Sequence, residues 1–148
     1  MGFYVRELQE EDFENNFPEV LAGLTTLGQI DKQAALNLYR TLKKKEDYRI
    51  FVVLKKDCNR VLGCATIFFE YKFIHGLSVV GHVEDVVVEE EHRGHGLGKM
   101  LVSRLVDESK KKGCYKTILA CAERNVNFYM KIGFEAKEKE MVLYHEKE

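Results

Sequence analysis

A glycine-rich segment between a strand-like run and a long helical pattern constrains this chain more than any other feature. The segment spans Arg93–Gly98 and carries glycine at positions 94, 96 and 98. The apolar, β-branched run Val79–Val88 precedes it and predicts a strand. In Leu97–Lys112 leucines recur at a spacing of four, which predicts an amphipathic helix. Glycines let a backbone approach an anion closely, and the first amides of a helix are free to donate. The segment therefore predicts a pyrophosphate site.

Two common nucleotide-binding motifs do not fit this segment. A Walker A loop needs a glycine and a hydroxyl residue where this chain has Arg93 and Met100. A Rossmann loop needs the spacing G-x-G-x-x-G inside a βαβ unit, whereas the spacing here is G-x-G-x-G. A flexible glycine connection without a ligand remains an open alternative. His92 and His95 lie three residues apart in a charged loop, a pattern typical of solvent-exposed histidines, so we expect no metal there.

The rest of the chain predicts helices and strands in a mixed order. We expect one domain over residues 1–148, because 148 residues with 45% apolar content suffice for a single core. Pro18 should distort the first helix, Asp31 should cap the second, and Gly63 should mark a bulge. Gly113 and Gly133 should end the last two helices. The expected strands are Phe3–Glu7, Tyr48–Leu54, Val61–Tyr71, Val79–Val88, Tyr115–Cys121, Phe134–Ala136 and Met141–Tyr144, and the expected helices are Glu10–Leu24, Lys32–Lys45, Leu97–Lys112 and Asn125–Ile132.

Charge and cysteine content narrow the classes of function. The net charge of -1 argues against a nucleic-acid-binding protein, because such proteins carry a basic excess. The lysine runs Lys43–Lys45 and Lys110–Lys112 suit the carboxyl ends of predicted helices. The four cysteines show no C-x-x-C spacing and no signal peptide precedes them, so we expect reduced thiols in the cytoplasm. The longest apolar run, Val61–Phe69, is too short to cross a bilayer, and we expect no membrane partner.

The spacing Arg-x-x-Gly-x-Gly, after a strand and before a helix, is similar to the signature of the GNAT superfamily of N-acetyltransferases. The order of the surrounding elements is similar too, down to a short helix that carries a tyrosine. The resemblance implies an α+β fold, the GNAT-like acyl-CoA N-acyltransferase fold, with a splayed, mostly antiparallel sheet flanked by helices. It also implies that the strand before the loop is bulged and splays from its neighbour, and that acetyl-CoA lies in the resulting cleft. The implied coenzyme contacts are Val86, Val87, Val88, Arg93, Gly94, His95, Gly96, Leu97, Gly98, Lys99, Asn125, Tyr129, Met130 and Lys131.

Five blocks closely resemble the glucosamine 6-phosphate N-acetyltransferase family within that superfamily. They are Leu24–Gly28, Lys72–His75, Gly81–Val88, Gly113–Lys116 and Asn125–Phe134. The resemblance implies transfer of the acetyl group of acetyl-CoA to the amine of D-glucosamine 6-phosphate, in UDP-N-acetylglucosamine biosynthesis, by a homodimer. Acids and hydroxyls can hold a sugar, and cations can hold its phosphate. The implied substrate contacts are Thr25, Lys72, Phe73, Ile74, His75, Glu84, Asp85, Val86, Tyr115 and Lys116.

The resemblance also assigns the chemistry. It implies direct attack of the amine on the thioester, with the hydroxyl of Tyr129 stabilising or protonating the leaving thiolate. Glu84 and Asp85 are the catalytic acids expected near the amine. Neighbouring residues of a strand point to opposite faces, so we do not expect these two acids to act as a pair on one atom. Asn125 fits either a helix cap or a coenzyme contact.

Two positions depart from the pattern of that family. The family usually has an acid where this chain has Ala120, and often an arginine where it has Tyr144. Both departures concern the acceptor rather than the coenzyme. Two other functions therefore stay open. One is a GNAT enzyme that acetylates another amine, such as a polyamine or a protein N-terminus. The other is a non-catalytic module that binds acetyl-CoA.

Overall fold

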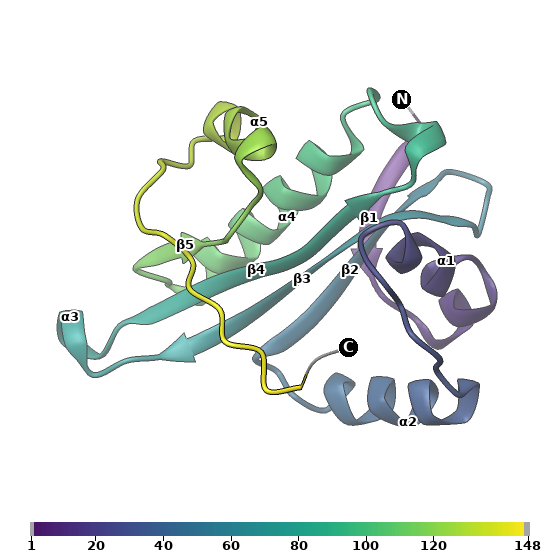
Figure 1. Cartoon of the computed structure of the whole chain (residues 1–148), viewed down its shortest axis with the longest axis horizontal. Coiled ribbons are helices and arrows are strands. Elements are labelled where there is room, and N and C mark those ends of the chain that lie inside the picture. Colours follow the sequence, from purple (N-terminus) through teal and green to yellow (C-terminus); the bar gives the residue numbers. More distant parts are fainter. Residues whose placement is uncertain (1, 147–148) are drawn as a thin grey trace. The chain divides into compact units, whose positions relative to one another are not determined.

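The computed structural model describes residues 2–146, which belong to two compact units. The first unit ends at Ile118 and the second begins at Leu119. The described part of the first unit contains a five-stranded sheet (Figure 1). The first four strands pair antiparallel in chain order and the fifth runs parallel to the fourth, which confirms the predicted α+β class with a mostly antiparallel sheet. The strands are β1 (Phe3–Glu7), β2 (Tyr48–Lys55), β3 (Val61–Tyr71), β4 (Val79–Val88) and β5 (Lys116–Ile118).

Helices cover both faces of this sheet. Phe17 of α1 and Tyr39 of α2 pack in one buried cluster with Val52 of β2. The guanidinium carbon of Arg104 in α4 lies 5.0 Å from the ring centre of Phe51. Phe51 and Val52 are neighbours in a strand, so α4 covers the face opposite to α1 and α2. The helical elements of this unit are η1 (Glu10–Glu14), α1 (Phe17–Ala22), α2 (Lys32–Lys43), α3 (Ile74–Leu77), η2 (Glu90–His92) and α4 (Leu97–Lys112).

The predicted helix Glu10–Leu24 is two elements, η1 and α1, and not one distorted helix. Asn16 separates them with a left-handed backbone, φ 80°. Pro18 follows in the first turn of α1, where the missing amide hydrogen has no helical partner to lose and the fixed φ suits the helix. The proline therefore begins a new helix. Other local signals are confirmed: Asp31 caps α2 by accepting from the amide of Ala34 at 2.9 Å, and Gly113 ends α4 with φ 82°.

The pairing of β3 explains the glycine at position 63. The register between β2 and β3 shifts at Val53/Leu54, opposite Gly63 and Val61, which confirms the predicted bulge. A Cβ atom on Gly63 would lie 2.8 Å from the carbonyl oxygen of Val87 in β4. Glycine thus lets β3 and β4 approach closely just where β4 leads into the glycine-rich loop.

The second unit is small. Its described residues contain η3 (Glu123–Asn125) and α5 (Val126–Ile132), which ends at Gly133 in a left-handed conformation as predicted. Residues 134–146 form no strand, so the predictions of Phe134–Ala136 and Met141–Tyr144 were wrong. The predicted strand Tyr115–Cys121 is also shorter, Lys116–Ile118. A strand requires a neighbouring backbone to pair with, and β-forming residues alone do not supply one. No helix within residues 2–146 is long and apolar enough to span a membrane.

Candidate active site

The glycine-rich loop presents open backbone at the start of a long helix. Gly94 and Gly96 have φ values of 86° and 78°, a left-handed conformation that favours glycine. A Cβ atom at either position would meet no atom within 4 Å, so space is open on the side where a Cβ would lie. Leu97, 1% exposed, anchors the first turn of the 16-residue helix α4 in the core. The amides of this turn can therefore donate to an anion without any rearrangement of the fold, and the loop fits a pyrophosphate group.

Cationic side chains flank this loop. The side chain of Arg93 is exposed and its Nε donates to the carbonyl of Val88 at 3.2 Å, which ties the loop to the end of β4. His95 and Lys99 are exposed, and the His95 ring lies 6.4 Å from that of Phe3 in β1. Gly98 is half-buried in the first turn of α4. Among residues 2–146 no group of three or more His, Cys, Asp or Glu side chains could hold a metal ion.

β4 carries the bulge that the resemblance implied. Thr66 pairs with Glu84 and Cys64 with Val87, so two residues of β4, Asp85 and Val86, lie opposite one residue of β3. Asp85 takes a positive φ of 51°. Such a bulge interrupts the alternation of side chains along the strand.

The expectation that Glu84 and Asp85 point to opposite faces assumed a regular strand, and this bulge interrupts the strand at Asp85. Both side chains are exposed. Burial first, and then the charges of Asp85 and Glu84, raise the pKa of the Tyr48 hydroxyl, so both carboxylates contribute to the electrostatic environment of that tyrosine. The sequence could not reveal this, because the alternation rule applies to a regular strand and the bulge depends on pairing with β3.

Beyond its pairing with β5, the edge of β4 presents backbone that a ligand can contact. Its parallel pairing with β5 covers only Val80, Gly81 and His82. The edge of β4 from Val83 to Val88 therefore has no β5 residue opposite it in the described register. Val87 is buried in the core, whereas Val86 and Val88 are half-buried. An extended chain can add to such an edge by strand-like hydrogen bonds.

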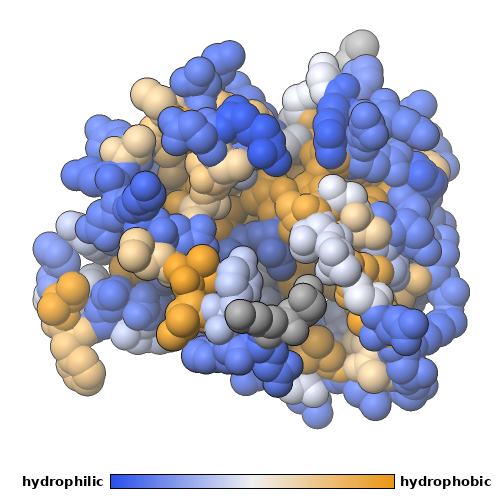
Figure 2. Space-filling view, viewed as in Figure 1, coloured by the Kyte–Doolittle hydropathy of each residue, from blue (hydrophilic) through white to orange (hydrophobic). Residues whose placement is uncertain are grey.

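Two of the predicted acceptor segments lie together. The ring of His75, at the turn between β3 and β4, stacks on that of Tyr115 with centres 4.2 Å apart. The amide of Tyr115 donates to the carbonyl of Val79 at 2.8 Å, and the ammonium of Lys116 lies 5.9 Å from the Tyr115 ring. Phe73 and Ile74 are 91% and 61% exposed. Figure 2 shows an apolar patch where Figure 1 places α3.

Thr25 and Lys72 are two further acceptor candidates of this unit. Thr25 is exposed in the loop between α1 and α2. Lys72 Nζ lies 3.5 Å from an oxygen of Glu70.

A row of rings that the sequence did not single out lies beside Glu84. Tyr48, Phe68 and His82 come from β2, β3 and β4 and stack face to face, with ring centres 6.1 and 4.5 Å apart. His82 Nε2 lies 2.9 Å from Glu70, and this hydrogen bond chiefly lowers the pKa of the Glu70 carboxyl. His82 and Glu84 are two apart before the bulge and share one face. Only the register of three strands could have identified this row.

The second unit holds the remaining predicted residues. Tyr129 of α5 is 9% exposed, and its ring makes edge contacts with Phe128 and Phe134. Burial, and to a lesser degree Cys121, raise the pKa of its hydroxyl. Asn125 stands at the N-cap position of α5, one of the two roles considered for it, but its side chain makes no capping hydrogen bond. The backbone of Asn125 already belongs to the preceding η3 turn. Met130, Lys131 and Ala120 are exposed.

The comparison with known families agrees with this geometry. Residues 4–134 match the acetyltransferase (GNAT) family. The chain belongs to this family.

Individual relatives are more specific. The chain is 35% identical to glucosamine 6-phosphate N-acetyltransferase 1 of Dictyostelium discoideum over 144 residues, 97% of this chain and 91% of that protein. It is 36% identical to glucosamine 6-phosphate N-acetyltransferase of Trypanosoma brucei brucei over 139 residues, 94% of this chain and 93% of that protein. The crystal structure of glucosamine-6-phosphate N-acetyltransferase from Arabidopsis thaliana is similar with a TM-score of 0.94 at 32% identity, covering 99% of this chain and 100% of that one.

Proposed function

We propose that this chain transfers the acetyl group of acetyl-CoA to the amine of D-glucosamine 6-phosphate, in UDP-N-acetylglucosamine biosynthesis. One observation carries the proposal: relatives that bear this activity in their names match the chain over nearly its whole length. The free thiols of Cys58, Cys64, Cys114 and Cys121 favour a reducing compartment, so we propose a cytoplasmic enzyme. We propose that it works as a homodimer.

The proposed coenzyme site follows the chain from β4 into α4. The amides of Gly94–Lys99 would bind the pyrophosphate, with the Arg93 guanidinium adding charge. The backbone of Val86–Val88 would bind the pantetheine arm as an added strand. An amide of this segment would donate to the thioester carbonyl as charge develops on its oxygen. Asn125, Met130 and Lys131 of the second unit complete the proposed set of coenzyme contacts.

The proposed acceptor site uses exposed charge. A sugar phosphate is anionic, and Lys72, His75 and Lys116 can supply positive charge or hydrogen-bond donors to its phosphate. Glu84, Asp85 and Thr25 can accept hydrogen bonds from its hydroxyls and amine. The contact of His75 with Tyr115 supports a common role for their two segments.

The proposed reaction is a direct displacement. The lone pair of the amine attacks the thioester carbon, the new C–N bond forms and the C–S bond breaks. The amine loses one proton, and we assign its acceptance to Glu84 or Asp85, or to water, because position 120 carries alanine. The departing thiolate takes a proton from the hydroxyl of Tyr129, and the resulting phenolate regains a proton from solvent. The raised pKa of that hydroxyl supports a group that stays protonated at neutral pH and donates.

A panel of amines tests this function. Purified protein is supplied with acetyl-CoA and with glucosamine 6-phosphate, glucosamine, a polyamine or a peptide with a free N-terminus, and the release of coenzyme A is followed. We expect the highest kcat/KM for the sugar phosphate and a large loss for glucosamine, which lacks the phosphate. Turnover of the polyamine or peptide without turnover of the sugar phosphate would assign another acceptor. Coenzyme binding without any turnover would indicate a binding module.

A further inference from the structure

A half-buried carboxylate shortly before the glycine-rich loop joins three separate segments of the first unit. Glu89 follows the last residue of β4, and its amide donates to the carbonyl of Leu62 in β3 at 2.8 Å. Its side chain is only 13% exposed. Both oxygens accept from Arg60, at 2.6 and 2.8 Å, in a bidentate pair with the turn between β2 and β3. Arg–carboxylate pairs of this form fix geometry as well as charge.

Two more partners complete the set. Asn16 Nδ2 donates to Glu89 at 3.1 Å and to the carbonyl of Val61 at 2.9 Å, which links the start of α1. His92 Nδ1, at the end of η2, is buried and lies 2.6 Å from Glu89, a close polar contact whose angles are not those of a hydrogen bond. Burial alone would raise the pKa of the Glu89 carboxyl, but Arg60, His92 and Asn16 together lower it. The group is therefore ionised at neutral pH, and its negative charge is neutralised by the partners around it.

The position of this cluster matters because the loop begins at its edge. His92 is followed directly by Arg93, whose own side chain binds the carbonyl of Val88. Gly94 and Gly96 come next, and no atom lies within 4 Å of a Cβ built on either. The loop is thus held at its end by the buried Leu97 and at its start through His92 and Arg93. An anion site gains affinity when its donors need no ordering upon binding.

We propose that Glu89 is a positioning residue for the coenzyme: through its own contacts with Arg60, Asn16 and His92, it fixes the start of the loop that binds the pyrophosphate. The inference rests on the proposed binding of acetyl-CoA. Glu89 does not contact the coenzyme itself and acts through the backbone of residues 92–94. Because its partners neutralise its charge, Glu89 does not repel the nearby pyrophosphate.

The test compares Glu89→Gln with Glu90→Gln. Both variants remove one negative charge from adjacent positions, but Glu90 is exposed and its side chain makes no hydrogen bond or ion pair within residues 2–146. Calorimetry with coenzyme A measures Kd, and initial rates measure kcat at saturating acetyl-CoA. For Glu89→Gln we expect Kd to rise about fivefold, the ratio that corresponds to one ordinary hydrogen bond, with little change in kcat. For Glu90→Gln we expect the wild-type Kd. A merely structural loss would lower the active fraction and the maximal rate instead.

A second variant keeps the test decisive if Glu89→Gln folds poorly. Arg60→Gln leaves the carboxylate with two of its partners, and it must also raise Kd. The double variant must bind no more weakly than Glu89→Gln alone, because both changes act through one contact. If Glu89→Gln binds coenzyme A with the wild-type Kd, the inference is overturned and the proposed function still stands. If Glu89→Gln does not fold, the same result for Arg60→Gln overturns the inference. A wild-type protein that binds no coenzyme A overturns both.

Discussion

At the scale of single residues, Tyr129 carries the most direct chemical prediction. Its ring is packed against Phe128 and Phe134, with centres 4.9 and 5.9 Å away, so replacement by phenylalanine keeps the packing. Burial raises the pKa of the hydroxyl, which keeps it protonated and able to donate. We expect Tyr129→Phe to lower kcat about 100-fold, as for loss of a general acid, and to leave the Kd of coenzyme A nearly unchanged.

Steady-state rates and calorimetry check this expectation together. Tyr71→Phe is the matched control, because it removes the hydroxyl of an exposed tyrosine of the first unit, and it should keep the wild-type kcat. If Tyr129→Phe turned over as fast as the wild type, Tyr129 would have no part in the chemistry. A large rise in Kd instead would assign its hydroxyl to coenzyme binding.

At the scale of elements, the two ends of α4 provide a comparison within one helix. Gly96 precedes it with φ 78° and Gly113 follows it with φ 82°, and a Cβ at either position meets no atom within 4 Å. A side chain in this conformation costs about 1–2 kcal/mol at both ends. We expect Gly96→Val to raise the Kd of coenzyme A about tenfold, because the strained loop relaxes away from the pyrophosphate. Gly113→Val should lower thermal stability similarly and leave Kd unchanged. Equal Kd values for the two variants would move the anion site elsewhere.

The elements also show what a sequence can predict. The glycine-rich loop, α4 and the limits set by Asp31 and Gly113 were predicted because their signals are local. The mostly antiparallel sheet was predicted from the resemblance. The left-handed backbone of Asp85, the row from Tyr48 to His82 and the partners of Glu89 were not predicted, because each depends on which strands lie side by side. The C-terminal strand was predicted wrongly, since apolar residues at 141–144 say nothing about whether a backbone partner is present.

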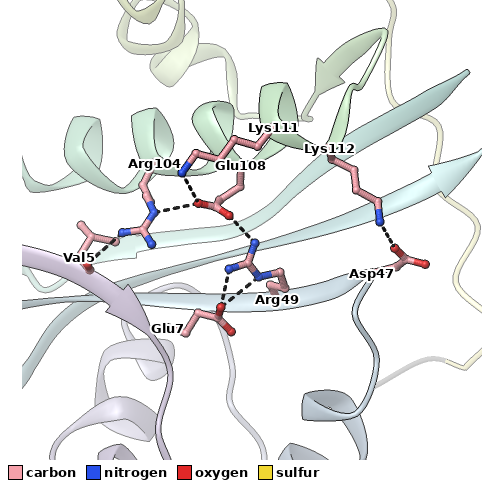
Figure 3. A network of polar contacts seen from close by, with 8 residues as sticks. All are labelled: Val5, Glu7, Asp47, Arg49, Arg104, Glu108, Lys111 and Lys112. Carbon is pink, nitrogen blue, oxygen red and sulfur yellow. Dashed lines mark hydrogen bonds and ion pairs between the residues drawn. The ribbon is translucent and has the colours of Figure 1, made fainter.

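At the scale of the whole molecule, a network of charges joins α4 to the sheet of the first unit. Glu108, 8% exposed, accepts from Arg49 of β2 and from Arg104 of α4, the latter at 3.1 Å. Arg49 also binds Glu7 of β1, and Lys111 lies 3.7 Å from Glu108 (Figure 3). One carboxylate therefore holds cations from two elements that are distant in sequence. Removing it leaves Arg104 and Lys111 without this counter-charge and Arg49 with Glu7 alone.

The loss of this carboxylate predicts a pH-dependent change in stability. Burial alone would raise the pKa of Glu108, but hydrogen bonds from Arg49 and Arg104 lower it below its unfolded value. A lowered carboxyl pKa contributes stability above the unfolded pKa, about 4.3, and loses it as the pH falls through the folded pKa. We expect Glu108→Gln to reduce the free energy of unfolding by about 2 kcal/mol at pH 7, less than for a fully buried pair because the cations are partly in water.

Denaturant unfolding at a series of pH values checks this prediction. The difference between wild type and Glu108→Gln should stay constant from pH 7 to about 5 and shrink below about pH 4, where the wild-type carboxylate takes up its proton. Asp107→Asn removes an exposed acid from the same turn of α4 and should match the wild type throughout. A difference that persists unchanged in acid would mean that the shape of the glutamate, rather than its charge, holds α4 to the sheet. In that case Glu108 would affect the coenzyme site only through the packing of α4, the helix that begins at the glycine-rich loop.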